Sequence, residues 1–147
     1  MQNHPSSRKV VFDLDVDDGY PPIASEGLWC TLIPNGTFRV DNIPFYVPGL
    51  ALGDTVSAEE VDGVLFGTGV VEQAGHSTVR IAFFDDSVVN EVRGTLQALG
   101  CTWESMKGGI FTTVDVPPEV VYADVIAFLA ARAQADGLDY EESCIQH

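Results

Sequence analysis

The sequence predicts an α+β fold in which an antiparallel, β-rich N-terminal half is followed by a ferredoxin-like βαββα(β) C-terminal half. In the first half, apolar and polar residues alternate with the period of a strand, and Gly, Pro and Asn-Gly turns interrupt them. From residue 76 on, strand patterns alternate with two segments whose apolar residues recur at helical spacing. We therefore expect a flexible tail over residues 1–8 and a single domain over residues 9–147, with a β-rich part at 9–75 and a βαββα(β) part at 76–147.

The N-terminal half consists of segments with the alternation of half-buried strands. These segments cover residues 9–16, 28–33, 38–43, 55–60 and 64–72. Asn35-Gly36 and Asp62-Gly63 connect two successive pairs, and both dipeptides accept the positive φ angles that a tight turn needs. We therefore predict two β-hairpins, one around each dipeptide.

The C-terminal half alternates between strand and helix patterns. Strand patterns cover residues 77–84, 101–106, 110–116 and 139–145, and helical patterns cover residues 87–99 and the segment between Pro117-Pro118 and Gly137. Gly100 is suited to cap the first helix, and Gly108-Gly109 to form the turn between the two middle strands. With the last strand at a sheet edge, this order of elements predicts the ferredoxin-like arrangement.

The chain is strongly acidic, with 22 Asp and Glu residues, seven Lys and Arg residues and a net charge of −15. The acids are spread along the whole chain, so the entire surface is expected to be negative. Such a field repels phosphate backbones and anionic lipids, and we therefore expect neither a nucleic acid nor a membrane as partner. Either the charge only keeps the protein in solution, or it favours a neutral or cationic partner.

The sequence also predicts a cytoplasmic protein without cofactors. No apolar run approaches the roughly 20 residues that span a bilayer, and the polar N-terminus lacks the apolar segment of a secretory signal. Cys30, Cys101 and Cys144 are odd in number and have no C-x-x-C spacing, so we expect buried thiols rather than disulfides or a zinc site. No nucleotide or metal motif is present, and we expect no cofactor.

His76 is the candidate proton-transfer residue, because it is the only histidine away from the termini and histidine titrates near neutral pH. It stands where a turn enters a predicted strand, so His76, Thr78 and Arg80 should line one face. A rise of about 3.3 Å per residue puts His76 and Arg80 roughly 13 Å apart, which suits opposite ends of a small molecule. In the competing interpretation His76 is a hydrogen-bonded turn residue and Arg80 is half of an ion pair.

The expected catalytic partners of His76 lie in loops and at strand ends, and they are Glu26, Asp41 and Tyr46. The residues expected to bind the substrate are Trp29, Asn42, Phe45, Ser77, Thr78 and Arg80. Trp29 and Phe45 would supply an apolar wall. Each of these residues in the N-terminal half also has a purely structural interpretation. Asp41 and Asn42 would form a turn, and Trp29 would be a core residue.

Several short motifs in a fixed order resemble a known family. They are Asp18-Gly19-Tyr20-Pro21-Pro22, Ser25-Glu26-Gly27-Leu28-Trp29, Asp41-Asn42-Ile43-Pro44-Phe45, Gly75-His76-Ser77-Thr78-Val79-Arg80 and Tyr140-Glu141-Glu142. The chain is similar, from about Val10 to its end, to the bacterial family catalogued as domain of unknown function 4265. The resemblance implies a common fold, and it places Glu26, Trp29, Asp41, Asn42, His76, Ser77 and Arg80 at motif positions without giving them roles.

Two functions from different classes are compatible with these observations. The first is a metal-independent acid/base enzyme acting on a small neutral or weakly polar organic substrate, for example a dehydration or conjugate-addition cyclase or lyase in a bacterial biosynthetic pathway. The second is a non-catalytic acidic adaptor or immunity-type inhibitor that captures a basic protein. An enzyme should hold His76 in a closed apolar pocket, whereas an inhibitor should present an exposed acidic face. A homodimer is left open in both cases.

Overall fold

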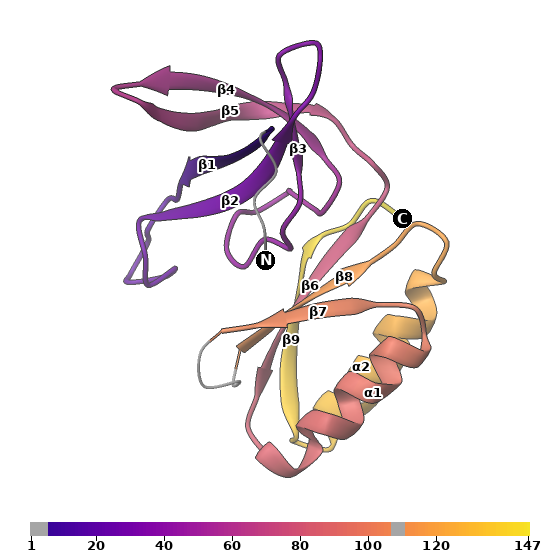
Figure 1. Ribbon diagram of the computed structural model, residues 1–147. Helices are drawn as coiled ribbons and strands as arrows, with labels where there is room; N and C mark the ends of the chain where they lie inside the picture. Colours follow the sequence, from indigo (N-terminus) through magenta and orange to yellow (C-terminus); the bar gives the residue numbers. More distant parts are fainter. Residues whose placement is uncertain (1–5, 107–110) are drawn as a thin grey trace. The chain divides into compact units, whose positions relative to one another are not determined.

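The computed structural model describes residues 6–106 and 111–147, which divide into two compact units, Met1–Ala74 and Gly75–His147 (Figure 1). Each unit has its own hydrophobic core. The expectation of a single domain over residues 9–147 stays a prediction. Most of the expected tail, residues 1–5, lies outside the described residues, and its last two residues, Ser7 and Arg8, belong to the first strand.

The first unit is a closed five-stranded barrel. Its strands are β1 (Ser7–Asp13), β2 (Ser25–Leu32), β3 (Phe38–Val40), β4 (Thr55–Val61) and β5 (Val64–Glu72). Neighbours along the chain pair antiparallel, and a short parallel pairing of β1 with β5 closes the barrel. The strands therefore have no continuous free edge at which the sheet could end.

The interior of the barrel is filled by alternate residues of these strands. Val10 and Phe12 of β1, and Leu28 and Cys30 of β2, point inward and are at most 9% exposed. Gly67 of β5 makes room for the largest of them, because a Cβ atom there would lie 2.2 Å from the ring of Phe12. The period-two alternation seen in the sequence thus becomes the inner and outer surface of the barrel.

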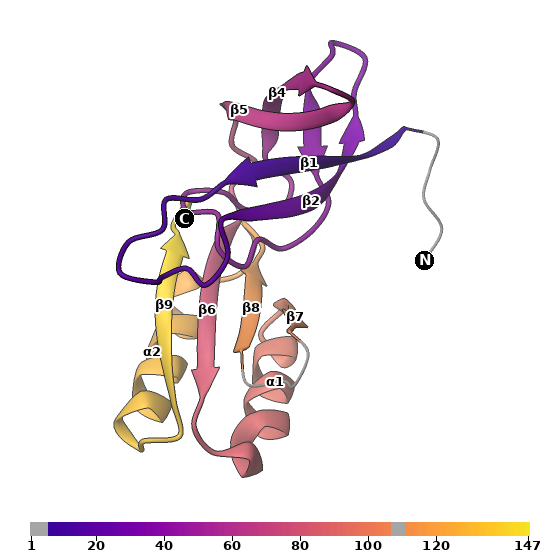
Figure 2. The same ribbon diagram turned by 90° about the vertical axis from the view of Figure 1, so that its left-hand side faces the viewer.

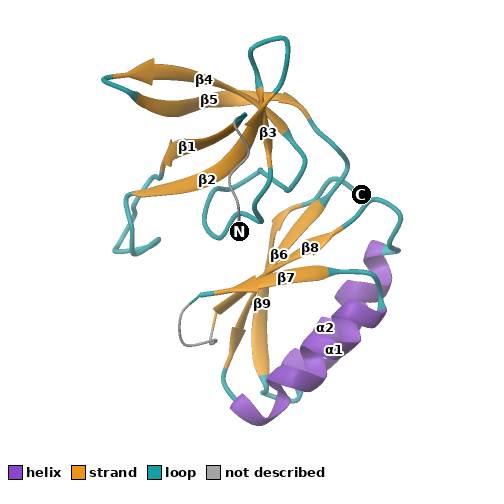
Figure 3. Ribbon diagram, in the orientation of Figure 1, coloured by secondary structure: helices purple, strands orange, loops and turns teal. Residues whose placement is uncertain are grey.

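The second unit is a four-stranded antiparallel sheet with two helices. Its elements are β6 (Ser77–Phe83), η1 (Asp86–Val88), α1 (Val89–Ala98), β7 (Thr102–Ser105), β8 (Phe111–Val116), α2 (Tyr122–Gln134) and β9 (Leu138–Cys144). The strand order is β7-β8-β6-β9, and both helices cover the same face of the sheet (Figures 2 and 3). Among the described residues, neither helix has the length and hydropathy needed to cross a membrane.

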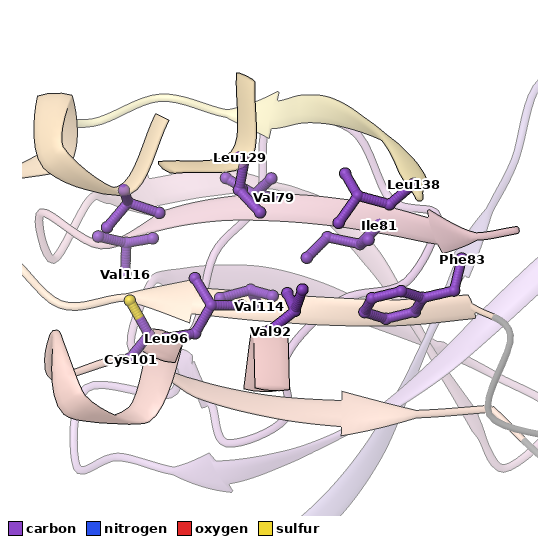
Figure 4. Close-up of a cluster of buried hydrophobic side chains, with 11 residues drawn as sticks. Val79, Ile81, Phe83, Val92, Leu96, Cys101, Val114, Val116, Leu129 and Leu138 are labelled. Carbon is purple, nitrogen blue, oxygen red and sulfur yellow. The ribbon is translucent and has the colours of Figure 1, made fainter. Parts of the chain in front are cut away.

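The core of this unit lies between the sheet and its helices. Val79, Ile81 and Phe83 of β6 face Leu96 of α1 and Leu129 of α2 (Figure 4). All five side chains are at most 4% exposed. Because residues two apart share a strand face, Thr78, Arg80 and Ala82 of β6 lie on the opposite, helix-free face.

The predicted fold class, α+β with a ferredoxin-like C-terminal half, is wrong. The chain is β-rich, with a closed five-stranded barrel and only two short helices. The sequence pattern identifies strands one at a time, but the barrel depends on pairing Val10 and Val11 with Leu65 and Phe66, which are far apart in the chain. Periodicity carries no information about such a non-local closure.

Several local predictions are confirmed. The two hairpins form around Asn35-Gly36 and Asp62-Gly63, and Gly36, Asp62 and Gly63 adopt positive φ angles of 86°, 51° and 82°. Both helices form, and β9 lies at a sheet edge. The turn expected at Gly108-Gly109 lies outside the described residues.

The predicted core thiols are also confirmed. Cys30, Cys101 and Cys144 are present as thiols and are at most 6% exposed. Burial, with a smaller contribution from the charge of Asp41, raises the pKa of the Cys30 thiol to about 12, and burial with the charge of Asp115 raises that of Cys101 to about 11. Both thiols are therefore unreactive near neutral pH.

Candidate functional site

The candidate site lies at the start of β6, where His76 meets a carboxylate from β8. The antiparallel register places Thr78 opposite Asp115, so the side chain of Asp115 is on the helix-free face of the sheet. His76 precedes β6 by one residue and contacts Asp115 diagonally across the two strands. The fold thus joins an imidazole to a carboxylate from residues that are 39 positions apart in the sequence.

The contact is close to both carboxylate oxygens. His76 Nδ1 lies 2.9 Å from Oδ1 and 3.0 Å from Oδ2 of Asp115. Because an ionised carboxylate can only accept hydrogen bonds, Nδ1 carries the proton in this arrangement. His76 Nε2 has no hydrogen-bond partner among the described residues. In the neutral imidazole, Nε2 therefore has a lone pair that can accept a proton.

Burial differs between the two partners. The side chain of His76 is 22% exposed, whereas that of Asp115 is 2% exposed. Loss of hydration raises the pKa of the Asp115 carboxyl above its usual value, and the hydrogen bond from His76 acts in the opposite direction. The carboxylate is thus held away from solvent, while the imidazole retains partial access to it.

A second histidine lies in the same unit. Ser77 Oγ is 2.6 Å from His147 Nδ1 and accepts a hydrogen bond from the backbone N–H of Gln146. His147 Nε2 is 2.8 Å from the carbonyl oxygen of Pro117, so Nε2 is the donor and Nδ1 accepts the proton of the Ser77 hydroxyl. In its protonated form, His147 lowers the pKa of Asp115, so this histidine also acts on the carboxylate.

Arg80 lies further along the same face of β6. The side chain of Arg80 is 6% exposed, and its guanidinium lies 3.1 Å from the carboxylate of Glu141, whose side chain is 59% exposed. With Ala82 and Phe111, these residues line a hollow of about 140 Å³. The expected ion pair of Arg80 is therefore confirmed, and it borders a space on the helix-free face.

Glu26 is an anchor for a backbone loop of the first unit. Its carboxylate is 8% exposed and accepts hydrogen bonds from the backbone N–H groups of Phe45, Tyr46 and Val47, at 2.8, 2.9 and 3.0 Å. Both oxygens are used by these three donors. The side chain thus fixes the loop that follows β3.

Asp41 and Asn42 hold the other end of this loop against β2. The side-chain oxygen of Asn42 accepts the backbone N–H of Trp29 at 2.7 Å, and Asp41 accepts hydrogen bonds from the Thr31 hydroxyl and from Arg39. Trp29 itself is half-buried on the outside of the barrel rather than in its core. The structural interpretation of Asp41 and Asn42 therefore accounts for their contacts.

The predicted aromatic residues of the loop are also packed. Tyr46 is 7% exposed, and its ring meets that of Tyr20 edge to face at a centroid distance of 6.1 Å. Phe45 is half-buried beside it in the chain. The predicted site residues thus fall into two groups: His76, Ser77, Thr78 and Arg80 in the second unit, and the remaining residues, Glu26, Trp29, Asp41, Asn42, Phe45 and Tyr46, in the first.

Asp115 and His147 were missed by the sequence reasoning. Asp115 lies in the run Thr112-Thr113-Val114-Asp115-Val116, where an acid alternates with core valines. That alternation places Asp115 on the strand face that points away from the core valines. Only the strand register shows that His76 lies on the same face. For His147, nothing in the sequence indicates its contact with Ser77, which lies 70 positions earlier.

Three comparisons with known proteins bear on this chain. Residues 26–140 match the model of a family described as a domain of unknown function, DUF4265. The chain belongs to this family. No curated protein is similar to it at a significant level. Among solved structures, it is similar to a hypothetical protein from Neisseria gonorrhoeae, with 26% identity and a TM-score of 0.82 over 100% of this chain and 99% of the other.

Proposed function

We propose that this protein is an acid/base enzyme that transfers a proton to or from a small organic substrate, with His76 as the proton-transfer group. The observation that carries the proposal is the pairing of His76 Nδ1 with both oxygens of the buried Asp115. A carboxylate in this position holds the imidazole in one tautomer and stabilises the imidazolium that forms when Nε2 takes a proton. Asp115 is thus a positioning residue.

Arg80 supports the same proposal as a group that could hold the substrate. It follows His76 on the same face of the strand, at roughly 13 Å by the rise of an extended chain. Its hollow of about 140 Å³ with Ala82 and Phe111 suits a short apolar or carbonyl-bearing group, which would lie beside the Arg80–Glu141 ion pair. His76 itself does not line the hollow at Arg80.

Glu26, Asp41 and Tyr46 receive no chemical role in this proposal. Both oxygens of Glu26 accept backbone hydrogen bonds, and Asp41 is engaged by Thr31 and Arg39. A group that must exchange protons during a reaction needs an oxygen that is not already used to hold the backbone. The cytosol is the proposed compartment, because the three cysteines are buried and present as thiols.

The proposal is tested by hydrogen exchange at carbon, which does not require knowledge of the product. A set of small ketones and 2-keto acids is incubated with the protein in deuterium oxide, and incorporation of deuterium is followed by NMR. We expect incorporation with the wild type and a rate at least about 100-fold lower for His76→Gln. Asp115→Asn should lower the rate while preserving the fold.

For comparison, His147→Gln removes the other described imidazole of this unit. Because His147 acts on Asp115 only through its charge, this variant should lose less of the exchange than His76→Gln does. If His76→Gln exchanged as fast as the wild type, His76 would not be the base. If no compound exchanged with the wild type, abstraction of a proton beside a carbonyl would be excluded for this set of compounds.

A non-catalytic acidic binding protein is the second candidate, and one observation favours it. Asp13, Asp15, Asp17 and Asp18 are all exposed at the end of β1 and in the turn that follows it. Such a cluster attracts a basic protein, with an affinity that falls as salt rises. Replacement of Asp15, Asp17 and Asp18 by Asn should abolish capture of a basic partner while leaving deuterium exchange unchanged.

A further inference from the structure

A groove in the first unit lies where the barrel closes. The parallel pairing of β1 with β5 consists of Val10 with Leu65 and Val11 with Phe66, whereas the pairing of β1 with β2 runs from Ser7 to Asp13. β1 thus lies between β2 and β5, but its first residues are paired on one side only (Figure 2). Ser7, Arg8 and Lys9 line a groove of about 640 Å³ there, together with the start of β5.

This groove carries positive charge on an otherwise acidic protein. Of the seven Lys and Arg residues in the sequence, Arg8 and Lys9 both line it, and Glu60 is the only acid among the lining residues. Lys9 forms no ion pair with any described residue. An anionic group entering the groove would therefore meet a lysine that is not already neutralised.

An aromatic surface lies next to this charge. Trp29 pairs directly with Lys9 across β1 and β2, and the Lys9 ammonium lies 6.0 Å from the centre of the Trp29 ring. Gly27 fixes this position, since a Cβ atom at residue 27 would lie 2.4 Å from Cε of Lys9. The lysine side chain thus crosses the glycine and holds its ammonium beside the indole.

We propose that this groove binds a small aromatic carboxylate. Lys9 and Arg8 hold the carboxylate, and Trp29 with Val11 and Leu65 contacts the ring. A volume of about 640 Å³ is within the range of sites for small organic ligands. The site is independent of His76 and requires no residue of the second unit.

The test uses 2-naphthoate and its neutral analogue 2-naphthamide, followed by two-dimensional NMR of the full chain. We expect 2-naphthoate to shift the indole N–H signal of Trp29 in a saturable way and to bind at least about tenfold more tightly than 2-naphthamide. Trp103, the second tryptophan, should not shift, because it does not line the groove.

Three variants separate the contributions. Lys9→Ala should weaken binding about tenfold, and Gly27→Ala should weaken it too, because it displaces Lys9 without changing the charge. Arg39→Ala is the matched control, since Arg39 lies in the same barrel but is paired with Asp41. It should bind as the wild type does. Preserved amide spectra exclude unfolding as the cause of any loss.

Four results would overturn the proposal. They are equal affinity for the acid and its amide, unchanged binding by Lys9→Ala, an equal shift of Trp103, and tighter binding of hexaglutamate, which would identify the groove as a site for an extended acidic peptide.

Discussion

The buried carboxylates of Glu26 and Asp115 have different kinds of partner. Glu26 accepts three backbone N–H groups, so its charge is used to fix a loop. Asp115 accepts a hydrogen bond from an imidazole that is partly open to solvent. At the scale of single residues, only the second arrangement couples a buried charge to a group that can exchange protons.

Removal of the Glu26 carboxylate should destabilise the fold. In Glu26→Ala, the backbone N–H groups of Phe45, Tyr46 and Val47 lose their acceptor, and an unsatisfied buried donor costs about 1–3 kcal/mol. We expect the free energy of unfolding to fall by about 3 kcal/mol in urea titrations. Glu26→Gln should lose less, because one oxygen remains. Glu60→Ala, at an exposed position, should change it by less than about 0.5 kcal/mol.

Asp115 should make the stability depend on pH in a defined direction. Its pKa is raised in the folded protein, so the folded state binds the proton more tightly than the unfolded state does. The contribution of this carboxyl group to the free energy of unfolding is largest below its pKa in the unfolded protein. It is lost as the pH rises through its pKa in the folded protein. The free energy of unfolding of the wild type, relative to Asp115→Asn, should therefore fall as the pH rises from about 3.8. A rise over this range would contradict the direction of the shift.

At the scale of elements, the sequence predicts local structure well and non-local pairing poorly. The Asp62-Gly63 hairpin depends on two residues that tolerate positive φ, and such a signal is contained within the turn itself. The closure of the barrel depends on Val10 and Val11 meeting Leu65 and Phe66, and nothing in either segment specifies the other. The fold class was therefore wrong although most strands were placed correctly.

The same division applies to the site. His76, Thr78 and Arg80 could be assigned to one strand face because the period of a strand is two. The contact of His76 with Asp115 could not be predicted, because it requires the register of β6 against β8. For Glu26 the sequence shows an acid near a strand, but its three backbone donors come from a loop about 20 residues later.

Two glycines of β5 test the packing of the barrel. In Gly67→Ala, the new Cβ atom would lie 2.2 Å from the Phe12 ring, so the ring must move within a closed core. We expect a loss of about 1–3 kcal/mol in the free energy of unfolding. Gly69→Ala is the matched control, since its nearest neighbour would be Ser57 Oγ at 3.9 Å. Equal losses for both variants would show that backbone conformation, and not the contact with Phe12, sets the cost.

At the scale of the whole molecule, the net charge of −15 is spread over two units that each have their own core. Repulsion among these charges is stronger in the compact folded state than in the expanded unfolded state. Sodium chloride should therefore raise the thermal unfolding midpoint between low and physiological ionic strength, as screening shortens the range of repulsion. A midpoint that fell with added salt in calorimetry would show that attractive ion pairs dominate instead.

The tautomer of His76 is the property on which the proposed function depends most directly. Long-range proton–nitrogen NMR of the neutral imidazole distinguishes the two ring nitrogens. We predict that His76 carries its proton on Nδ1, which faces Asp115, and that His147 carries its proton on Nε2, which faces the Pro117 carbonyl. The opposite result for His76, with the proton on Nε2, would remove the lone pair that accepts the substrate proton and would contradict the proposed function.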